Sequence, residues 1–276
     1  EFSQEDICVV DRGELRASVV RKAQKLTGQP RLGVAPSPMA SAMTVAKQLV
    51  PFARTSSLRN VRRYRLNPDE MRRLQLAGED TRLSESGANI ATAIRAIRAS
   101  GQIDAITKPM AKIVPGLEDL RVEQAGRHEV LRFRQRQDGD RVAEFEATEM
   151  SEGALRALGI IVAAHQMERD ELLIVEEPEV SIHAGAAGLL FDVLKAASER
   201  GAVLVTTHSA DLLDRARDEE ILVCAYREGV TRIGPLAQAQ REIVREGLFS
   251  LAELMRSEPL RIEGDDVDGA RRPARR

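Results

Sequence analysis

The sequence predicts an α/β protein with a parallel sheet flanked by helices and, apart from it, a meander of antiparallel strands. From residue 149 onward, apolar runs such as LLIV at 172–175 and AVLVT at 202–206 alternate with helical periods. This pattern is typical of parallel strands that are buried on both faces. Residues 117–148 instead alternate apolar and charged side chains, and Asp138-Gly139 is a hairpin turn signal.

The individual elements follow from hydrophobic periodicity and from breakers such as Gly28, Pro30 and Pro68. Before the meander, we expect helices at Glu14–Leu26 and Met43–Phe52, an extended piece at 31–38, a strand at Val61–Leu66, a short helix from Pro68 and a helix at Ile90–Ile97. After it, we expect a helix at Ser151–Met167, a strand at Leu172–Val175, a helix at Gly185–Glu199 and strands at Ala202–Thr206 and Ile221–Tyr226.

Composition excludes several classes of protein. The 276 residues carry 41 Lys and Arg against 43 Asp and Glu, a net charge of −2, so the chain is no bulk polycation. Aromatic residues make up only 3%, which argues against a stacking platform for single-stranded nucleic acid. Cys8 and Cys224 stand far apart in apolar surroundings, as buried free thiols would, and no zinc motif occurs. Without an apolar run of ~18 residues or a secretory signal, we expect a cytoplasmic protein with no membrane partner.

Two carboxylates follow the apolar strand LLIV directly. Glu176 and Glu177 end this buried strand, and Pro178 then turns the chain away. Buried carboxylates are costly unless they hold a cation or act on a substrate, and parallel sheets place such residues just beyond the carboxyl ends of their strands. The alternative is an ordinary acidic exit from a strand.

Two further groups lie where phosphate could be bound. His208 follows the strand AVLVT and could contact a phosphate or orient a water, or it could simply precede a helix that Ser209 caps. Ser151-Glu152-Gly153 opens a helix, whose N-terminus suits an anion, although it could be a plain helix cap.

Taken together, these groups resemble a known family. The stretches MSEGALRALGIIVAAHQ, LLIVEEPEVSIH and VLVTTHSADLLD resemble the second half of an ABC-type ATPase head with a P-loop NTPase-like fold. The resemblance is to AAA-family ATPases with a RecF- and SMC-like head, including the ATPase part of OLD-family proteins. RLSESGANIATAIRAI and GLFSLAELMRSEPL also resemble this family, so the similarity covers most of residues 60–262.

The resemblance implies the cofactors ATP and Mg²⁺ and a role for each motif. Glu177 matches the carboxylate that polarises the attacking water, and Glu176 matches the acid that holds Mg²⁺ through water. His208 matches the switch histidine that contacts the γ-phosphate. These are the parts that phosphoryl transfer needs for positioning and charge stabilisation.

The resemblance also implies contacts across a head-to-head dimer. Ser151, Glu152 and Gly153 match the signature motif, which binds the γ-phosphate of ATP held by the opposite subunit. Ser181 and His183 fall on the D-loop, although Ala184 stands where this family usually has proline. The implied partner is a second copy of the chain or a related ATPase subunit.

The sequence departs from the family at one important motif. No G-x-x-x-x-G-K-[ST] occurs in the 276 residues, and the Gly-rich stretch TGQPRLGVAPSP at 27–38 lacks its GK[ST] part. The loop that cradles the β- and γ-phosphates is therefore missing. We expect either an N-terminally truncated product or a degenerate subunit that lends its signature to a partner.

The sequence thus predicts a partial ATPase head over residues 1–262 and a disordered polar tail over 263–276. The expected activity is ATP hydrolysis through ATP-dependent dimerisation, in DNA repair or phage defence, with DNA as a candidate partner. The alternative is a non-catalytic, ATPase-like interaction subunit. A weaker third candidate is an OLD-type nuclease, since Asp265, Asp266 and Asp268 could imitate a metal cluster, although a solvated tail explains them better.

One group of basic residues has two interpretations. Arg132, Arg134 and Arg136 share one face of a strand in the meander. They could contact DNA, but a solvated sheet face explains the same pattern and is favoured.

Overall fold

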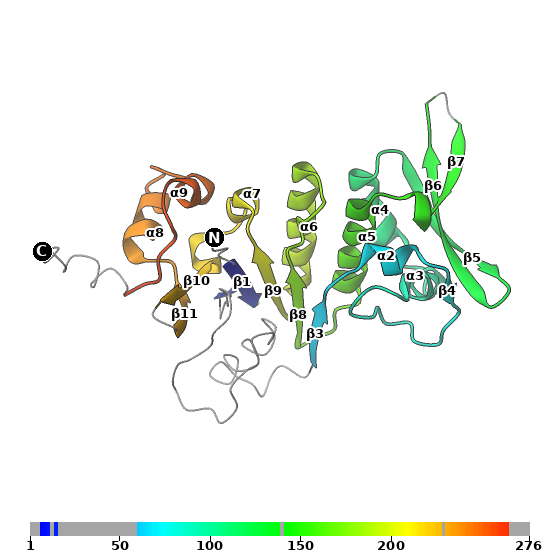
Figure 1. Cartoon of the computed structure of the whole chain (residues 1–276), viewed down its shortest axis with the longest axis horizontal. Helices are drawn as coiled ribbons and strands as arrows, with labels where there is room; N and C mark the ends of the chain where they lie inside the picture. Colours follow the sequence, from blue (N-terminus) through cyan, green and yellow to red (C-terminus); the bar gives the residue numbers. More distant parts are fainter. Residues whose placement is uncertain (1–5, 12–13, 16–59, 139–140, 228–229, 265–276) are drawn as a thin grey trace, which may run out of the picture. The chain divides into compact units, whose positions relative to one another are not determined.

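The computed structural model describes residues 6–11, 14–15, 60–138, 141–227 and 230–264 (Figure 1). These residues fall into two compact units. One comprises residues 60–201, and the other comprises the described residues before 60 and after 201. The predicted elements at 31–38 and 43–52, Gly139 of the hairpin turn and most of the polar tail lie outside the described residues.

The unit of residues 60–201 is built around two parallel strands. β3 (Asn60–Tyr64) pairs in parallel with β8 (Glu171–Glu176), with Val61 opposite Leu172. Leu172–Val175 are all buried, as their apolar sequence predicts, and Glu171 before them is buried as well. A short helix, α2 (Pro68–Arg72), follows β3, with Asn67 as its N-cap. The predicted strand, its apolar neighbour and the helix opened by Pro68 are confirmed.

The antiparallel meander is also confirmed. β5 (Leu117–Ala125) and β6 (His128–Arg136) form its centre, and β7 (Val142–Glu146) pairs with the second half of β6. A two-residue strand, β4 (Gln75–Leu76), pairs with the start of β6. Because β5 covers the other side of β6, β4 and β7 share one edge of that strand and leave Val130 and Leu131 between them.

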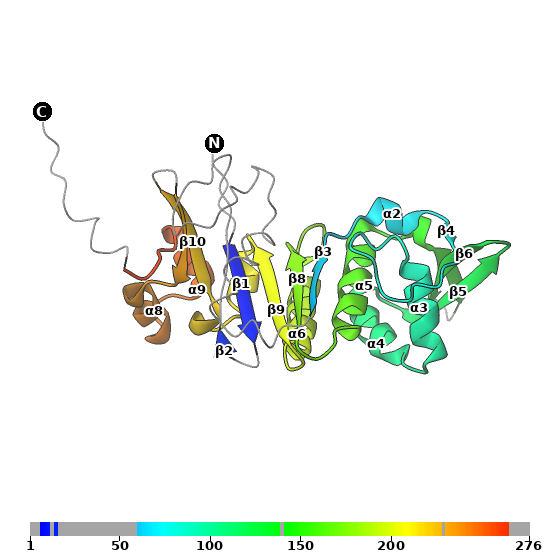
Figure 2. The ribbon, with the colours of Figure 1, turned by 90° about the horizontal axis from the view of Figure 1, so that it is seen from below.

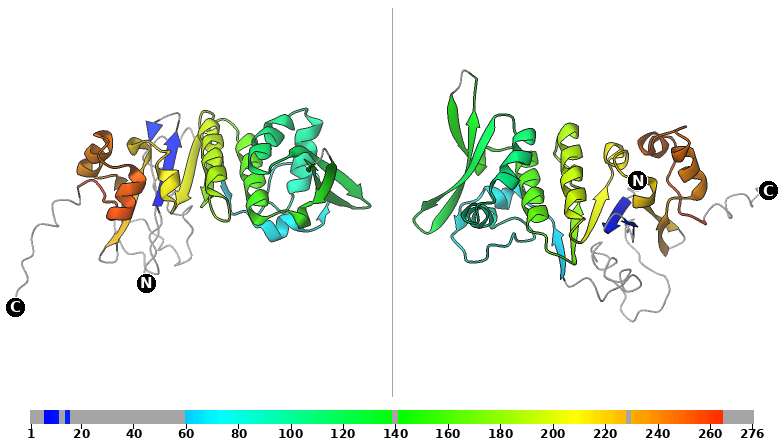
Figure 3. Two further views of the ribbon diagram at one scale, coloured as in Figure 1. Left: turned by 90° about the horizontal axis from the view of Figure 1, so that it is seen from above. Right: turned by 180° about the vertical axis from the view of Figure 1, so that it is seen from behind.

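Four longer helices complete this unit. They are α3 (Ile90–Ala99), α4 (Asp104–Ile113), α5 (Glu152–His165) and α6 (Ala184–Ala197), followed to residue 201 by a short turn. Figures 2 and 3 show α6 beside α5, α5 beside α3 and α4, and the meander beyond them. Ile90, Ile94 and Ile97 lie on the buried face of α3, as predicted. A short 3₁₀ turn at Ala147–Glu149 leads from β7 to α5.

The second unit contains the remaining described strands. Its strands are β1 (Asp6–Asp11), β2 (Glu14–Leu15), β9 (Ala202–Thr207), β10 (Leu222–Arg227) and β11 (Val230–Pro235). β1 lies between β9 and β10 and is antiparallel to both, so these two predicted strands run in the same direction. Glu14 and Leu15 pair with Asp11 and Val10, which corrects the helix predicted to begin at Glu14. A local hairpin pairing therefore outweighs the helical periodicity there.

Helices of this unit pack on one hydrophobic cluster. α7 (Ala210–Leu213), a 3₁₀ turn at Asp218–Glu220, α8 (Gln238–Arg245) and α9 (Leu251–Ser257) are its helical elements. Leu213, Val223 and Leu251 belong to the cluster and are at most 2% exposed. Cys224 in β10 is a buried free thiol, as predicted. Within the described residues, every helix is too short or too polar to cross a bilayer.

Candidate functional site

The two carboxylates sit where the sequence predicts, at the carboxyl end of β8. Glu176 is the last strand residue, and both it and Glu177 are half-buried. Glu177 has φ 44°, in the left-handed region that non-glycine residues rarely adopt. Pro178 is buried directly behind it. The turn therefore holds Glu177 in a strained backbone conformation, which is common where a side chain serves a site.

A cavity of about 940 Å³ opens in front of these carboxylates, within the unit of residues 60–201. Its lining residues come from the end of β3, the start of α2, the loop before α3, helix α5 and the end of β8 with the segment that follows it. The lining residues are Arg63, Arg65, Leu66, Asn67, Pro68, Glu70, Ser84, Glu85, Ser86, Arg156, Glu176, Glu177 and Val180.

Arg63 joins the carboxylate end of β8 to the loop before α3. Its Nε lies 3.5 Å from Glu176 Oε1 and 3.2 Å from Glu85 Oε1. The loop is fixed to the chain after β3, because Arg65 N–H donates to the Glu85 carbonyl and Asn67 N–H donates to that of Ser86, each at 2.9 Å. The cavity wall therefore has a defined backbone and a resident counter-ion for Glu176.

The predicted signature and D-loop residues meet within the same unit. Ser151 is the exposed N-cap of α5, and its Oγ accepts from Ala154 N–H at 3.2 Å. A Cβ on Gly153 would lie 2.2 Å from the carbonyl oxygen of Ser181, so only glycine allows this approach. Ser181 has φ 63°, and its Oγ donates to Glu152 Oε2 at 3.5 Å.

His183 has a structural role that the sequence analysis did not assign. It is the N-cap of α6, and its Nδ1 accepts from Gly185 N–H at 3.3 Å. Its exposed ring thus sits at the start of the helix that follows the carboxylate turn. Its D-loop role stays a prediction.

His208 belongs to the other unit, where it is exposed directly after β9. Thr207 Oγ1 accepts from Ser209 N–H at 2.9 Å, and Ser209 caps α7 through Leu212 N–H at 3.3 Å. Ser209 as a helix cap is therefore confirmed. The contact between His208 and a γ-phosphate remains a prediction.

Sequence reasoning missed the basic side of the cavity. Arg63 lies near the end of β3, Arg65 directly follows that strand and Arg156 lies on α5, and none of them was a candidate. The missing information was the parallel pairing of β3 with β8, which brings the carboxyl ends of these strands to one edge. The alternating basic residues of VRRYRL were the available signal.

The carboxylate pair fits a magnesium ion that is also held by phosphate and water. Within the described ranges, no cluster of three or more His, Cys, Asp or Glu side chains could cage a metal. Mg²⁺ at nucleotide sites is usually bound by one or two carboxylates, together with waters and substrate phosphates. Glu176 and Glu177 are such a pair and line an open cavity.

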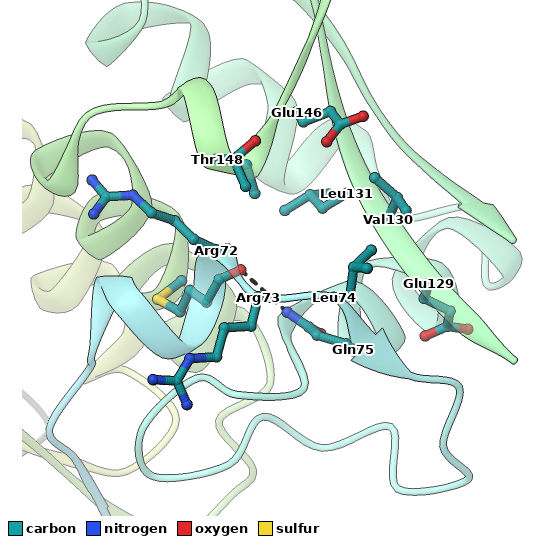
Figure 4. A pocket seen from close by; sticks show the side chains of 11 residues that line it. Arg72, Arg73, Leu74, Gln75, Glu129, Val130, Leu131, Glu146 and Thr148 are labelled. Atoms are coloured by element: carbon teal, nitrogen blue, oxygen red, sulfur yellow. Dashed lines mark hydrogen bonds between the residues drawn. The ribbon is translucent and has the colours of Figure 1, made fainter. Parts of the chain in front are cut away.

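A second cavity, of about 240 Å³, lies at the edge of the meander (Figure 4). Leu74 and Gln75 face Val130 and Leu131 of β6 across it, and Gln75 Nε2 donates to the Met71 carbonyl at 3.3 Å. Its two carboxylates are already paired: Glu129 with Arg95 at 2.5 Å and Glu146 with Arg132 at 3.0 Å. This cavity therefore offers weaker chemistry than the one at Glu176.

Arg132, Arg134 and Arg136, on one face of the meander, all form ion pairs. Arg132 Nε lies 2.9 Å from Glu123, and Arg134 and Arg136 lie 3.5 and 2.5 Å from Glu118. Leu131 and Phe133 point to the buried face of the same strand. These pairs favour the solvated-face interpretation over the DNA-contacting one.

Comparison with known proteins identifies the class. Residues 16–214 match a family model described as "AAA domain, putative AbiEii toxin, Type IV TA system". The match spans well over half of the chain, so the chain belongs to this family of AAA domains. The predicted AAA-type ATPase class and the α/β fold class are thereby confirmed. No curated protein matches the sequence.

Solved structures of ABC-type heads also align with the chain. One, titled as structural biochemistry of ATP-driven dimerization and DNA-stimulated activation of SMC ATPases, has 16% identity and a TM-score of 0.42; the alignment covers 56% of this chain and 94% of that one. An Smc head from Pyrococcus yayanosii has 17% identity and a TM-score of 0.41, covering 57% and 31%. An Smc head from Pyrococcus furiosus, bound to the C-terminal domain of ScpA, has 16% identity and a TM-score of 0.38, covering 57% and 39%.

Proposed function

We propose that the chain is the larger part of an ATP-hydrolysing ABC-type head that works by ATP-dependent dimerisation. The observation that carries this proposal is the two carboxylates Glu176 and Glu177 at the end of a buried strand, where they line a large cavity together with arginines. The AAA family of the chain supports ATP as the ligand.

The residues of the chain would divide the work as follows. Glu177, which the turn holds in a left-handed backbone conformation, would accept a proton from the attacking water. Glu176 would hold Mg²⁺ through water, and a bound ion would supply positive charge next to the phosphates. Arg63 keeps Glu176 oriented toward the cavity wall through its bridge to Glu85.

The signature completes a site on a second subunit. Ser151 and Glu152 are exposed at the N-terminus of α5, where backbone N–H groups and the helix dipole favour an anion. Gly153 packs on the Ser181 carbonyl, so movement of the D-loop would shift the signature with it. We propose that this surface receives the γ-phosphate of ATP bound by a second copy or a related head.

The first experiment measures ATP turnover with Glu177→Gln as the variant. Because no Walker A motif occurs in these 276 residues, we expect weak ATP binding and little turnover by the chain alone. Turnover is therefore measured after mixing with a related head that carries Walker A. Glu177→Gln should lower it by about 10²-fold or more, since the amide cannot take the proton. Equal turnover by Glu177→Gln and wild type would contradict the role of this carboxylate.

The second candidate function is that of a non-catalytic subunit that lends its signature to a partner. The absence of G-x-x-x-x-G-K-[ST] from these residues favours it specifically. In the mixing experiment such a subunit would stimulate the partner through Ser151 while Glu177→Gln had no effect. The two candidate functions are thus separated by one pair of variants.

For the biological process we propose phage defence, with DNA repair as the alternative. The family description names a type IV toxin–antitoxin system, which supports the first. DNA is the candidate partner, and it would contact a surface other than the ion-paired face of Arg132, Arg134 and Arg136. A cytoplasmic location and an overall extent of 1–262 for the head complete this proposal.

A further inference from the structure

Strand β4 of the meander sheet has one open edge. It pairs with β6 on one side and lies at the end of the sheet, so no described strand covers its other side. Ala77 N–H donates to the Arg127 carbonyl, on the β6 side, at 3.0 Å. Because the backbone groups of successive strand residues alternate in direction, the N–H and carbonyl of Leu76 face away from β6. Neither group has a hydrogen-bond partner among the described residues.

This open edge carries apolar side chains. Leu74 and Leu76 are 64% and 65% exposed, and with Leu248 they are the most exposed large hydrophobic side chains that the structure describes. Gln75 between them is buried instead, and its Oε1 accepts from Ala91 N–H at 2.8 Å. Edge strands are commonly protected by charged side chains or by a covering segment, because an open edge invites pairing with another strand. The two leucines leave the edge of β4 without such protection.

The charges that flank the leucines are complementary to each other. Arg73 precedes the leucines and Glu79 follows them, both side chains are exposed, and neither forms an ion pair with a described residue. Figure 4 shows that the Arg73 side chain points away from β6. When two copies of an edge strand pair in antiparallel orientation, the cationic end of one copy lies beside the anionic end of the other. This segment therefore complements a second copy of itself.

We propose that two copies of the chain associate by antiparallel pairing of their β4 edges about a two-fold axis at Leu76. In this register Arg73 falls opposite Glu79 of the second copy. Leu74 falls opposite Gly78, where no side chain stands in its way. Such an interface is isologous, so each of these contacts occurs twice. Backbone hydrogen bonds supply the affinity, as in other cases of strand addition, and the flanking charges fix the register.

This association differs from the ATP-dependent dimerisation proposed above. It uses the edge of the meander sheet instead of the start of α5, and it needs no nucleotide. Since β4 contains only two residues, the contact is smaller than the interface of a stable dimer, and the association is weak. A covalent trap is therefore the appropriate measurement.

The test places a cysteine at the two-fold axis, in the full chain and without nucleotide. The Cα atoms of a directly opposed, hydrogen-bonded pair lie about 5.5 Å apart, which a disulfide can span. Under mild oxidation, Leu76→Cys should form disulfide-linked dimers about tenfold faster than Leu248→Cys, because pairing holds the two thiols at a high effective concentration. Leu248→Cys is the matched control, since both leucines are almost equally exposed and Leu248 lies outside β4. Non-reducing gel electrophoresis gives the rates.

Charge reversal tests the register. In the Leu76→Cys chain, Arg73→Glu and Glu79→Arg should each slow crosslinking about fivefold or more, because each turns two attractive pairs into repulsive ones. The double reversal places opposite charges beside each other again and should recover the original rate. Adding Ser151→Arg instead should leave the rate unchanged, because the signature surface takes no part in this contact.

A thermal melt of each variant guards against a folding defect, and the exposed positions should leave the melting temperature unchanged. If Leu76→Cys crosslinks no faster than Leu248→Cys, β4 does not pair with its own copy and the proposal is wrong. If the double reversal stays as slow as the single ones, the two-fold register is wrong. Because no step of the test uses ATP, failure of the proposed ATP hydrolysis would leave this result standing, and the converse also holds.

Discussion

Glu177 combines a chemical task with an unfavourable backbone. Its φ of 44° lies in a region where a side chain costs about 1 kcal/mol or more, while glycine is at ease there. Asp170 and Ser181 share this left-handed conformation, and both flank the same strand and turn. The left-handed conformation of Glu177 in the turn after β8 therefore lowers the stability of the folded chain.

The first prediction measures that cost. Glu177→Gly should have a free energy of unfolding about 1 kcal/mol above that of Glu177→Ala, because only the alanine keeps a Cβ in the left-handed region. Chemical denaturation of both variants gives the difference. At Glu179, which is not among the left-handed residues, the order should reverse, since glycine adds entropy to the unfolded chain. The same order at both positions would contradict the strain.

The second prediction compares two glycines at matched helix positions. Gly153 and Gly185 are each the second residue of their helix, after the N-caps Ser151 and His183. Gly153→Ala should lower the free energy of unfolding by about 1–3 kcal/mol, because the Cβ would collide with the Ser181 carbonyl. Gly185→Ala meets only His183 Nδ1 at 3.6 Å, so it should be neutral or slightly stabilising. Equal losses at both positions would argue against the close contact.

At the scale of elements, the end of α5 carries a pH-dependent group. Burial and the nearby Arg200 cation hold the pKa of His165 below its usual value, and His165 Nε2 lies 3.0 Å from Gln102 Oε1. The unfolded chain binds the proton more readily than the folded one. The contribution of neutral His165 to the free energy of unfolding is therefore complete above a pH of about 6.5. It is lost as the pH falls toward the lower pKa of the folded state.

The third prediction follows from this sign. The free energy of unfolding of the wild type should decrease between pH 7 and pH 5.5, and His165→Gln should flatten that decrease. Urea titrations at several pH values provide the measurement. Between pH 7.5 and 8.5, His165 should add no pH dependence to the free energy of unfolding. If this free energy changes equally with pH below pH 7 in the wild type and in His165→Gln, His165 does not cause the decrease.

Elements with a strong period were predictable, and those decided by tertiary contacts were not. The spacing of Ile90 and Ile94 predicts α3, and the N-cap Ser151 predicts the start of α5. The unbroken apolar run before Glu176 predicts β8. α4 was missed, because Pro109 in its interior breaks the helical signal in the sequence. The fold tolerates this proline because Ile106 and Met110 on either side of it are fully buried.

The candidate site divides in the same way. Glu176, Glu177 and Ser151 could be predicted, because each stands at the boundary of a strongly patterned element. Arg63 and Arg156 could not, because their place in the cavity depends on how β3 pairs with β8 and how α5 packs, which no local pattern records. Gly153 was predicted for its motif, and its contact with Ser181 supplies a reason that the sequence alone does not contain.

For the molecule as a whole, Ser151 separates a dimerising ATPase from a simple nucleotide binder. The residue is an exposed helix cap, so Ser151→Arg should leave the fold intact, at a loss of about 1 kcal/mol for the cap. In heads that carry a Walker A motif, this variant should bind ATP almost normally but neither dimerise nor hydrolyse it. Size-exclusion chromatography with ATP and a turnover assay measure these outcomes.

A mixing control sharpens this fourth prediction. Ser151→Arg heads combined with Walker A-mutant heads should regain about one working site per heterodimer, because each supplies what the other lacks. If Ser151→Arg heads dimerise and hydrolyse ATP on their own, Ser151 acts only as the cap of α5.

The direction of β1 limits where a phosphate loop can enter its unit. Asp6 lies opposite Thr207 and Asp11 lies opposite Ala202, so the chain leaves β1 at the end of β9 that is remote from His208. In a nucleotide-binding loop that follows its strand, the phosphates are met at the carboxyl end of that strand. A loop that follows β1 would meet them at the wrong edge for His208. A cradle that directly follows its strand and lies beside His208 would therefore follow a strand that runs parallel to β9.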